Sequence, residues 1–108
     1  MKFGILTLKP LDFKLDLNRI HSYADGKGLS TLTTAVIKDQ FGNIIKNGTL
    51  VSFLLKNGYN TLKIYEKTIN GIAQIKCLHP NKVQNFEVLA SINGLAKSNT
   101  INITYKLK

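Results

Sequence analysis

The sequence has a single cysteine, Cys77, among its 108 residues. An intramolecular disulfide is therefore impossible, which excludes a secreted mini-domain held together by disulfides. No apolar run approaches the about 20 residues that a membrane-spanning helix needs, so no membrane span is predicted. The chain is long enough for one core without disulfides or metal ions, and it is too short for two domains.

Acidic residues and arginine are also scarce. Six Asp and Glu stand against fifteen Lys and Arg, which gives a formal net charge of +9, and fourteen of the fifteen basic residues are lysines that are never adjacent. Nucleic-acid-binding proteins usually concentrate their charge and use arginine for bidentate contacts, so no specific nucleic-acid binding is predicted. The lysines instead predict a solubilising coat that protects strand edges and gives a weak attraction to acidic surfaces.

Helical periodicity is missing, and short alternating runs take its place. The predicted strands are residues 3–9, 11–18, 31–38, 44–45, 49–55, 62–68, 73–77, 86–92 and 100–105. Turn signals separate them at intervals of roughly 8–12 residues, which is typical of an all-β sandwich. The run 49–55 is apolar on both faces and is predicted to be a central strand. The sequence therefore predicts an antiparallel β-sandwich of seven to nine strands.

The strands are separated by residues that favour turns. Asp and Asn side chains accept hydrogen bonds from nearby backbone N–H groups, and glycine adopts positive φ without strain. The residues assigned to structural turns are Asp25, Gly26, Asp39, Gly42, Asn43 and Gly71.

Residues 1–10 are predicted to be an extra strand or docking segment ahead of a domain spanning 11–108. The segment starts with Met1, its apolar run stops at Lys9, and no small-residue cleavage site follows, so we interpret it as a strand and not a secretory signal. It is apolar on both faces and needs cover, so Phe3, Ile5 and Leu6 are candidate partner contacts through β-addition.

Aromatic residues in turns are the other candidates for a binding surface. Tyr59 lies in an Asn-Gly-Tyr-Asn turn and is a candidate partner contact, since an exposed aromatic side chain can anchor an interface. We expect Phe41, in the turn at 39–43, to fold back over the end of the core instead.

No catalytic, cofactor-binding or metal-binding residue is nominated. Alternation places Cys77 inward as an inert thiol, and His79, ahead of Pro80, is interpreted as a loop residue. One cysteine and two histidines cannot close a structural zinc site, and the six acidic residues are too scattered for a calcium loop or a paired-carboxylate hydrolase. The chain is therefore predicted to be non-enzymatic and to bind no cofactor.

An ordered set of short patterns resembles a known family. The patterns are Ala24-Asp25-Gly26, Ala35-x-Ile37-x-Asp39, Gly42-Asn43, Gly48-Thr49-x-Val51-x-Phe53, Gly71-x-Ala73-x-Ile75 and Phe86-x-Val88-x-Ala90-Ser91-Ile92-Asn93-Gly94. Together they cover roughly residues 11–105 and resemble the bacterial Ig-like domain, group one, the repeat of intimin- and invasin-type adhesins. The resemblance implies an Ig-like sandwich. Modules of a similar kind also occur in tailed-phage virions as capsid decoration, fibre or tail-tube additions.

Three functional hypotheses remain open. The first is a phage virion accessory protein that is made in the host cytoplasm and binds a capsid or tail protein; the single-unit length, the absence of a signal and the N-terminal run favour it. The second is one repeat of a bacterial outer-membrane adhesin, located at the cell surface and bound to a host surface receptor. The third is an accessory domain of a carbohydrate-active enzyme, which would need a stripe of exposed aromatic residues that the sequence lacks.

Overall fold

The computed structural model describes residues 8–108, and these residues form eight β-strands and no helix. The strands are β1 (Leu15–Asn18), β2 (Leu29–Thr34), β3 (Leu50–Asn57), β4 (Asn60–Lys67), β5 (Gln74–Leu78), β6 (Gln84–Ile92), β7 (Ala96–Lys97) and β8 (Ile101–Tyr105). The predicted all-β class and the number of strands are confirmed. No membrane-spanning helix is present among residues 8–108.

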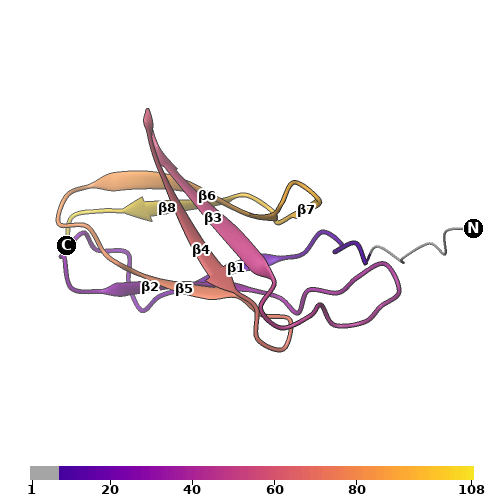
Figure 1. Ribbon diagram of the computed structural model, residues 1–108. Coiled ribbons are helices and arrows are strands. Elements are labelled where there is room, and N and C mark those ends of the chain that lie inside the picture. The colour runs from indigo at the N-terminus through magenta and orange to yellow at the C-terminus, as the bar shows by residue number, and fades with distance from the viewer. Residues whose placement is uncertain (1–7) are drawn as a thin grey trace, which may run out of the picture.

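Two antiparallel sheets pack face to face as a sandwich (Figure 1). The smaller sheet has the order β1-β2-β5, and the larger has the order β4-β3-β6, with β7 and β8 both paired to β6. The order β1-β2-β5 facing β4-β3-β6-β8 is that of an Ig-like sandwich. In the larger sheet β3 and β6 occupy the middle, as strands C and F do in an Ig-like sandwich. The prediction that residues 49–55 form a central strand is confirmed, because β3 lies between β4 and β6.

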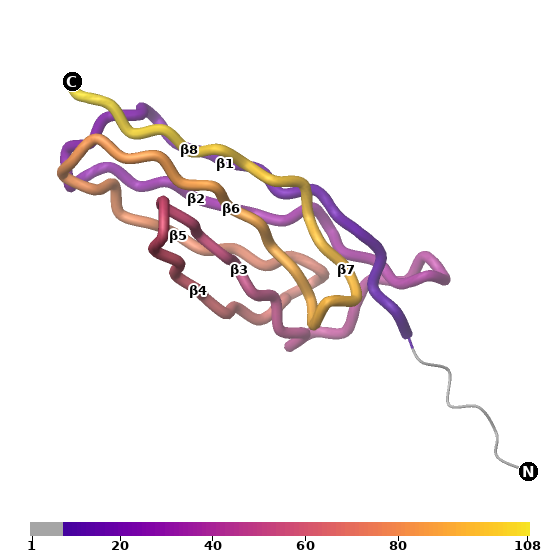
Figure 2. Tube along the Cα trace, turned by 90° about the horizontal axis from the view of Figure 1, so that it is seen from above, coloured from indigo at the N-terminus to yellow at the C-terminus, as the bar shows by residue number. Residues whose placement is uncertain are grey.

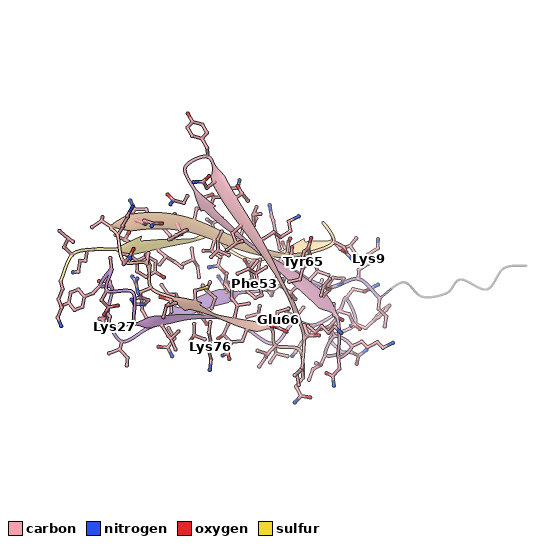
Figure 3. All side chains as sticks on the ribbon, turned by 60° about the vertical axis from the view of Figure 1, so that its left-hand side comes forward. Lys9, Lys27, Phe53, Tyr65, Glu66 and Lys76 are labelled. Atoms are coloured by element: carbon pink, nitrogen blue, oxygen red, sulfur yellow. The ribbon has the colours of Figure 1, made fainter. Side chains whose placement is uncertain are left out.

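The core consists of the inward-facing residues of both sheets. Every second residue of β3 is buried, namely Val51, Phe53 and Leu55, and Figure 3 shows Phe53 between the two layers. The other buried apolar residues are Phe13, Leu15, Leu32, Ile37, Ala73, Ile75, Val88, Ala90, Ile92, Ala96, Ile103 and Tyr105. This alternation is what two sheets with one wet face each require.

One long side of the sandwich is closed and the other is open. On the closed side β1 lies beside β8 (Figure 2) and the bridges Phe13↔Ser98 and Tyr23↔Lys106 join the two sheets. On the open side β4 and β5 are the outermost strands of their sheets. The β3–β4 hairpin crosses the sandwich steeply, so that its turn projects past β6 and β8 while its other end reaches the level of β5 (Figure 1).

Asp39 organises the turn at the end of the sandwich where the chain enters. Its Oδ1 accepts hydrogen bonds from the N–H groups of Phe41 at 2.9 Å and Asn43 at 3.0 Å. Gly42 follows with φ +81°, a conformation that favours glycine. Asp39 is itself buried. Its hydrogen bonds to the two N–H groups replace those to water that the carboxylate loses on burial.

The predicted strands 31–38 and 44–45 both extend beyond the regular pairing in the structure. The run 31–38 pairs regularly only to the end of β2, because the N–H groups of Ala35 and Ile37 donate to Lys14 O and Gly71 O in turn. The run 44–45 is reduced to the single bridge Lys38↔Ile44. The two-residue strand β7 was not predicted.

Most of the predicted segment 1–10 lies outside the described residues, and Phe3, Ile5 and Leu6 are among those outside. Near the start of the described residues, Gln40 N–H donates to Lys9 O at 3.1 Å and Pro10 pairs with Asp39. Alternation in the predicted run 11–18 places Leu11 on the same face as the buried Phe13 and Leu15, but Leu11 is 50% exposed, because the regular pairing of β1 starts only at Leu15.

Candidate protein-binding surface

The open side of the sandwich exposes an apolar cleft between two strand edges. The cleft, which we call the open cleft, has a volume of about 290 Å³. Its lining residues are Leu55, Leu62, Ile64, Lys76, Cys77, Leu78, Pro80, Phe86, Ile103 and Tyr105. At its mouth Leu62 is 58% exposed and Leu78 is 62% exposed. Apolar side chains gathered at exposed strand edges are typical of an interaction site.

A second groove has a volume of about 450 Å³. That second groove lies where the chain enters the sandwich and is lined by Leu8, Pro10, Asp39, Asn43, Ile44, Ile45, Lys46, Thr49, Ile92, Asn93 and Leu95. Among the described residues that line it, only Ile92 belongs to a strand, and Ile92 is paired with Ala96. The open cleft is therefore the stronger candidate for strand binding.

The outer edge of β4 carries backbone hydrogen-bonding groups that pair with no other strand of residues 8–108. Thr68 N–H, just after β4, donates to Thr49 O at 2.9 Å. Because bonded residues alternate along an antiparallel strand, the even-numbered residues of β4 form the hydrogen bonds to β3. Alternation then directs the N–H and C=O groups of the odd-numbered residues to the free edge, namely Thr61, Lys63, Tyr65 and Lys67. One of these groups, Lys67 N–H, donates to Glu66 Oε1 at 3.0 Å. The rest of this row is a template for an added strand.

The side chains of β4 divide into an apolar inner set and a basic outer set. Leu62 and Ile64 face the open cleft. Lys63, Tyr65 and Lys67 alternate with them and so face outward, and Lys63 Nζ lies 5.8 Å from the Tyr65 ring centroid. Figure 3 shows Tyr65 and Glu66 on this strand. The edge therefore offers apolar contacts on one face and positive charge on the other.

The two aromatic turn residues are both exposed. Tyr59 is fully exposed in the two-residue turn of the β3–β4 hairpin, where it is available for a partner contact. Phe41 is 56% exposed, so the expectation that it folds back over the core is wrong. Its backbone is held by Asp39 Oδ1 while its side chain points away from the core.

Three ionisable side chains meet near the C-terminal end of the sandwich. Ligand atoms of His21, Asp25 and His79 all lie within 4.8 Å of one another. Gly28 makes the approach possible, because a Cβ there would lie 2.7 Å from His79 Nδ1 and 2.8 Å from His21 Cε1. His79 follows the end of β5 and is a loop residue, as predicted, but it is only 2% exposed.

The hydrogen bonds of Tyr23 fix the protons on both histidine rings. Tyr23 N–H donates to His21 Nδ1 at 3.1 Å, so the neutral His21 ring carries its proton on Nε2, which lies 3.4 Å from Asp25 Oδ2. Tyr23 O accepts from His79 Nδ1 at 2.8 Å, because a carbonyl cannot donate. A metal ion needs nitrogen lone pairs, and this arrangement commits them to the protein. The cluster is better explained as a structural link than as a metal site.

A serine beside His79 has the spacing of a nucleophile and base but lies in the core. Ser30 Oγ is 2.9 Å from His79 Nε2, and Tyr105 Oη donates to Ser30 Oγ at 2.9 Å. With Nδ1 protonated, His79 Nε2 accepts the Ser30 hydrogen, which completes a chain of three side chains. Ser30 is fully buried, so no substrate reaches its hydroxyl. The chain of hydrogen bonds holds the two sheets together.

We expect metal chelation to have no effect on folding. EDTA should leave the melting temperature of the purified protein unchanged, and added zinc should not raise it, because the ring nitrogens of His21 and His79 are held by backbone and serine groups. Differential scanning calorimetry measures both effects. A fall in melting temperature with EDTA would show that the cluster holds a metal ion after all.

Asp25 is expected to contribute to stability in a pH-dependent way. The N–H groups of Gly28 and Lys27 donate to its Oδ1 at 2.9 Å each and hold the pKa of the carboxyl below its usual value of 3.8. A carboxyl whose pKa is depressed by folding stabilises the protein above its unfolded pKa, and this is lost as the pH falls through the folded pKa.

The wild type should therefore be more stable than Asp25→Asn at pH values well above 3.8, and the difference should vanish at lower pH. Urea unfolding at a series of pH values measures it. Asparagine keeps an oxygen for the turn, so the comparison isolates the charge. A difference that grows on acidification would contradict this explanation.

Cys77 lines the open cleft and is partly exposed. Burial raises the pKa of its thiol above the usual value of 9.0. Since the thiolate is the nucleophile, a raised pKa lowers reactivity. This geometry favours packing over chemistry for Cys77.

Sequence reasoning missed the His21–Asp25–His79 cluster and the open cleft. His21 and His79 are distant in sequence, and they meet only because β2 pairs with β5 and His79 N–H donates to Gly28 O. No local sequence pattern predicts such a contact. The Asp25-Gly26 turn signal marked the position of one member, but not its neighbours.

Comparison with known proteins assigns the chain to no family. No protein-family model matches it, and a search of curated proteins finds no match.

Proposed function

We propose that this chain is a non-enzymatic structural module that binds another protein. The observation that carries the proposal is the open side of the sandwich, where an unpaired strand edge borders an apolar cleft with Leu62 and Leu78 exposed at its mouth. The main alternative, catalysis by Ser30 and His79, is disfavoured because both side chains are buried. Among the described residues, every buried side-chain nitrogen and oxygen has a hydrogen-bond partner, as expected for groups that stabilise a fold.

We further propose that the partner is a capsid or tail protein and that the chain is a phage virion accessory protein. The support is the resemblance of residues 11–105 to Ig-like modules that also occur in tailed-phage virions, together with the Ig-like strand order. The same resemblance supports the second candidate, an adhesin repeat that binds a host surface receptor. Tyr59, fully exposed at the tip of a projecting hairpin, suits either kind of contact.

Purification of the chain with its natural assembly tests this proposal. The full chain, carrying a C-terminal affinity tag, is expressed in cells that make the remaining proteins of its source, and particles and membranes are separated by density. We expect the tagged chain in the particle fraction with a capsid or tail protein. Recovery with outer membranes favours the adhesin, and recovery with no partner from either fraction contradicts a binding role.

A further inference from the structure

We propose that the free edge of β4 is the docking site for an extended segment of another protein in which apolar and acidic residues alternate. The inference rests on the proposed protein-binding function and names the surface and the chemistry of the partner. It starts from the row of free backbone groups at Thr61, Lys63 and Tyr65 on an edge that no described strand covers.

The two faces of β4 set the pattern of the incoming strand. Residues directly opposite one another in paired strands have side chains on the same face. A partner residue opposite Ile64 therefore points into the open cleft, toward Leu78 across it, and must be apolar. A partner residue opposite Lys63 lies on the outer face, where an acidic side chain forms an ion pair.

The Glu66 carboxylate binds one of the backbone donors at the edge of β4. Its Oε1 accepts the hydrogen bond of Lys67 N–H, one of the edge donors. A carboxylate thus already takes the place that a carbonyl of an added strand would take. Because Glu66 is an inward-pointing charge at the end of the cleft, it also limits the docking edge to residues 61–65.

A second copy of this chain is a poorer occupant than an acidic segment. Two β4 strands paired antiparallel about Tyr65 place Lys63 opposite Lys67 twice, and pairing about Ile64 places Glu66 opposite Leu62. Each copy also carries a net charge of +9. Like charges directly opposite one another are destabilising, so charge complementarity favours a different, acidic partner.

The test uses a synthetic peptide of alternating valine and glutamate. Alternate residues along one edge are N-methylated, so that the peptide offers a single edge and does not stack on itself. Titrated into the full-length, ¹⁵N-labelled protein, it should shift the amide signals of Thr61, Lys63 and Tyr65 in a saturable way. A matched valine–lysine peptide should leave these signals in place.

Charge reversal on the edge of β4 should weaken binding of the peptide. We expect Lys63→Glu to reduce the affinity by about tenfold, whereas Lys14→Glu, which changes the net charge equally at an exposed residue outside β4, should retain it. Retained melting temperatures show that both variants are folded.

Three results would overturn the inference: peptide-induced shifts centred outside β4, equal binding by Lys63→Glu and Lys14→Glu, or concentration-dependent shifts of the same amides without peptide, which identify a second copy as the occupant. If these results rule out β4 as the docking site while a partner still co-purifies with the chain, the proposed function stands and only the proposed binding surface is wrong. If no partner co-purifies, the proposed function fails whatever the peptide does.

Discussion

Replacing His79 by alanine is expected to lower the free energy of unfolding by about 3 kcal/mol or more, because each buried polar group left without a partner costs roughly 1–3 kcal/mol. The imidazole donates to Tyr23 O and accepts from Ser30, so its loss leaves Tyr23 O and the hydroxyl hydrogen of Ser30 without a partner and opens a cavity between the sheets. For a chain of this size the melting temperature should fall by roughly 12–24 °C. Thermal unfolding followed by circular dichroism measures the change.

His21→Ala is the matched control for this prediction. Its ring belongs to the same cluster but is about one-third exposed, so water replaces its hydrogen bonds and the cost should be below about 1 kcal/mol. The structural interpretation of His79 is contradicted if His79→Ala keeps the wild-type melting temperature. A folded variant that loses a biochemical activity would instead point to a catalytic role.

Gly71→Ala is expected to lower the free energy of unfolding by about 2–5 kcal/mol, the sum of a backbone cost of roughly 1–2 kcal/mol and an overpacking cost of roughly 1–3 kcal/mol. Gly71 has φ +81°, and a Cβ there would lie 2.9 Å from the side chains of Ile44 and Val36. Both terms act at once, because the turn is strained for any other residue and is packed against the 36–45 loop. Urea unfolding measures the loss.

Gly42→Ala separates the two costs. Gly42 has the same φ of +81°, but a Cβ there meets no atom within 4 Å. It should therefore show the backbone cost alone, about 1–2 kcal/mol. Equal losses at the two glycines would mean that Gly71 is not packed as the structure has it.

The sequence was most informative where the chemistry is local. Asp39 and Gly42 predicted their turn, because an Asx side chain and a positive-φ glycine act within four residues of each other. The apolar residues on both faces of the run 49–55 also predicted the central place of β3, which pairs with β4 along one edge and with β6 along the other.

The sequence was least informative where distant segments meet. The contact between His21 and His79 depends on the pairing of β2 with β5, and the open cleft depends on how far the β3–β4 hairpin leans from the other sheet. Exposure of Phe41 and Leu11 was mispredicted for a related reason. An apolar residue beside a turn is buried only if another element covers it, and no local pattern says whether one does.

Photo-crosslinking from β4 tests most directly whether the open side of the sandwich binds a partner. A photoreactive benzoylphenylalanine replaces Tyr65, which is 55% exposed on the free edge, or Phe41, which is 56% exposed on the turn at 39–43. Both variants are irradiated in cells that make the natural assembly. We predict a covalent adduct with one partner protein from position 65 and none from position 41. An adduct from position 41 alone, or none from position 65 while a partner co-purifies, would contradict the account.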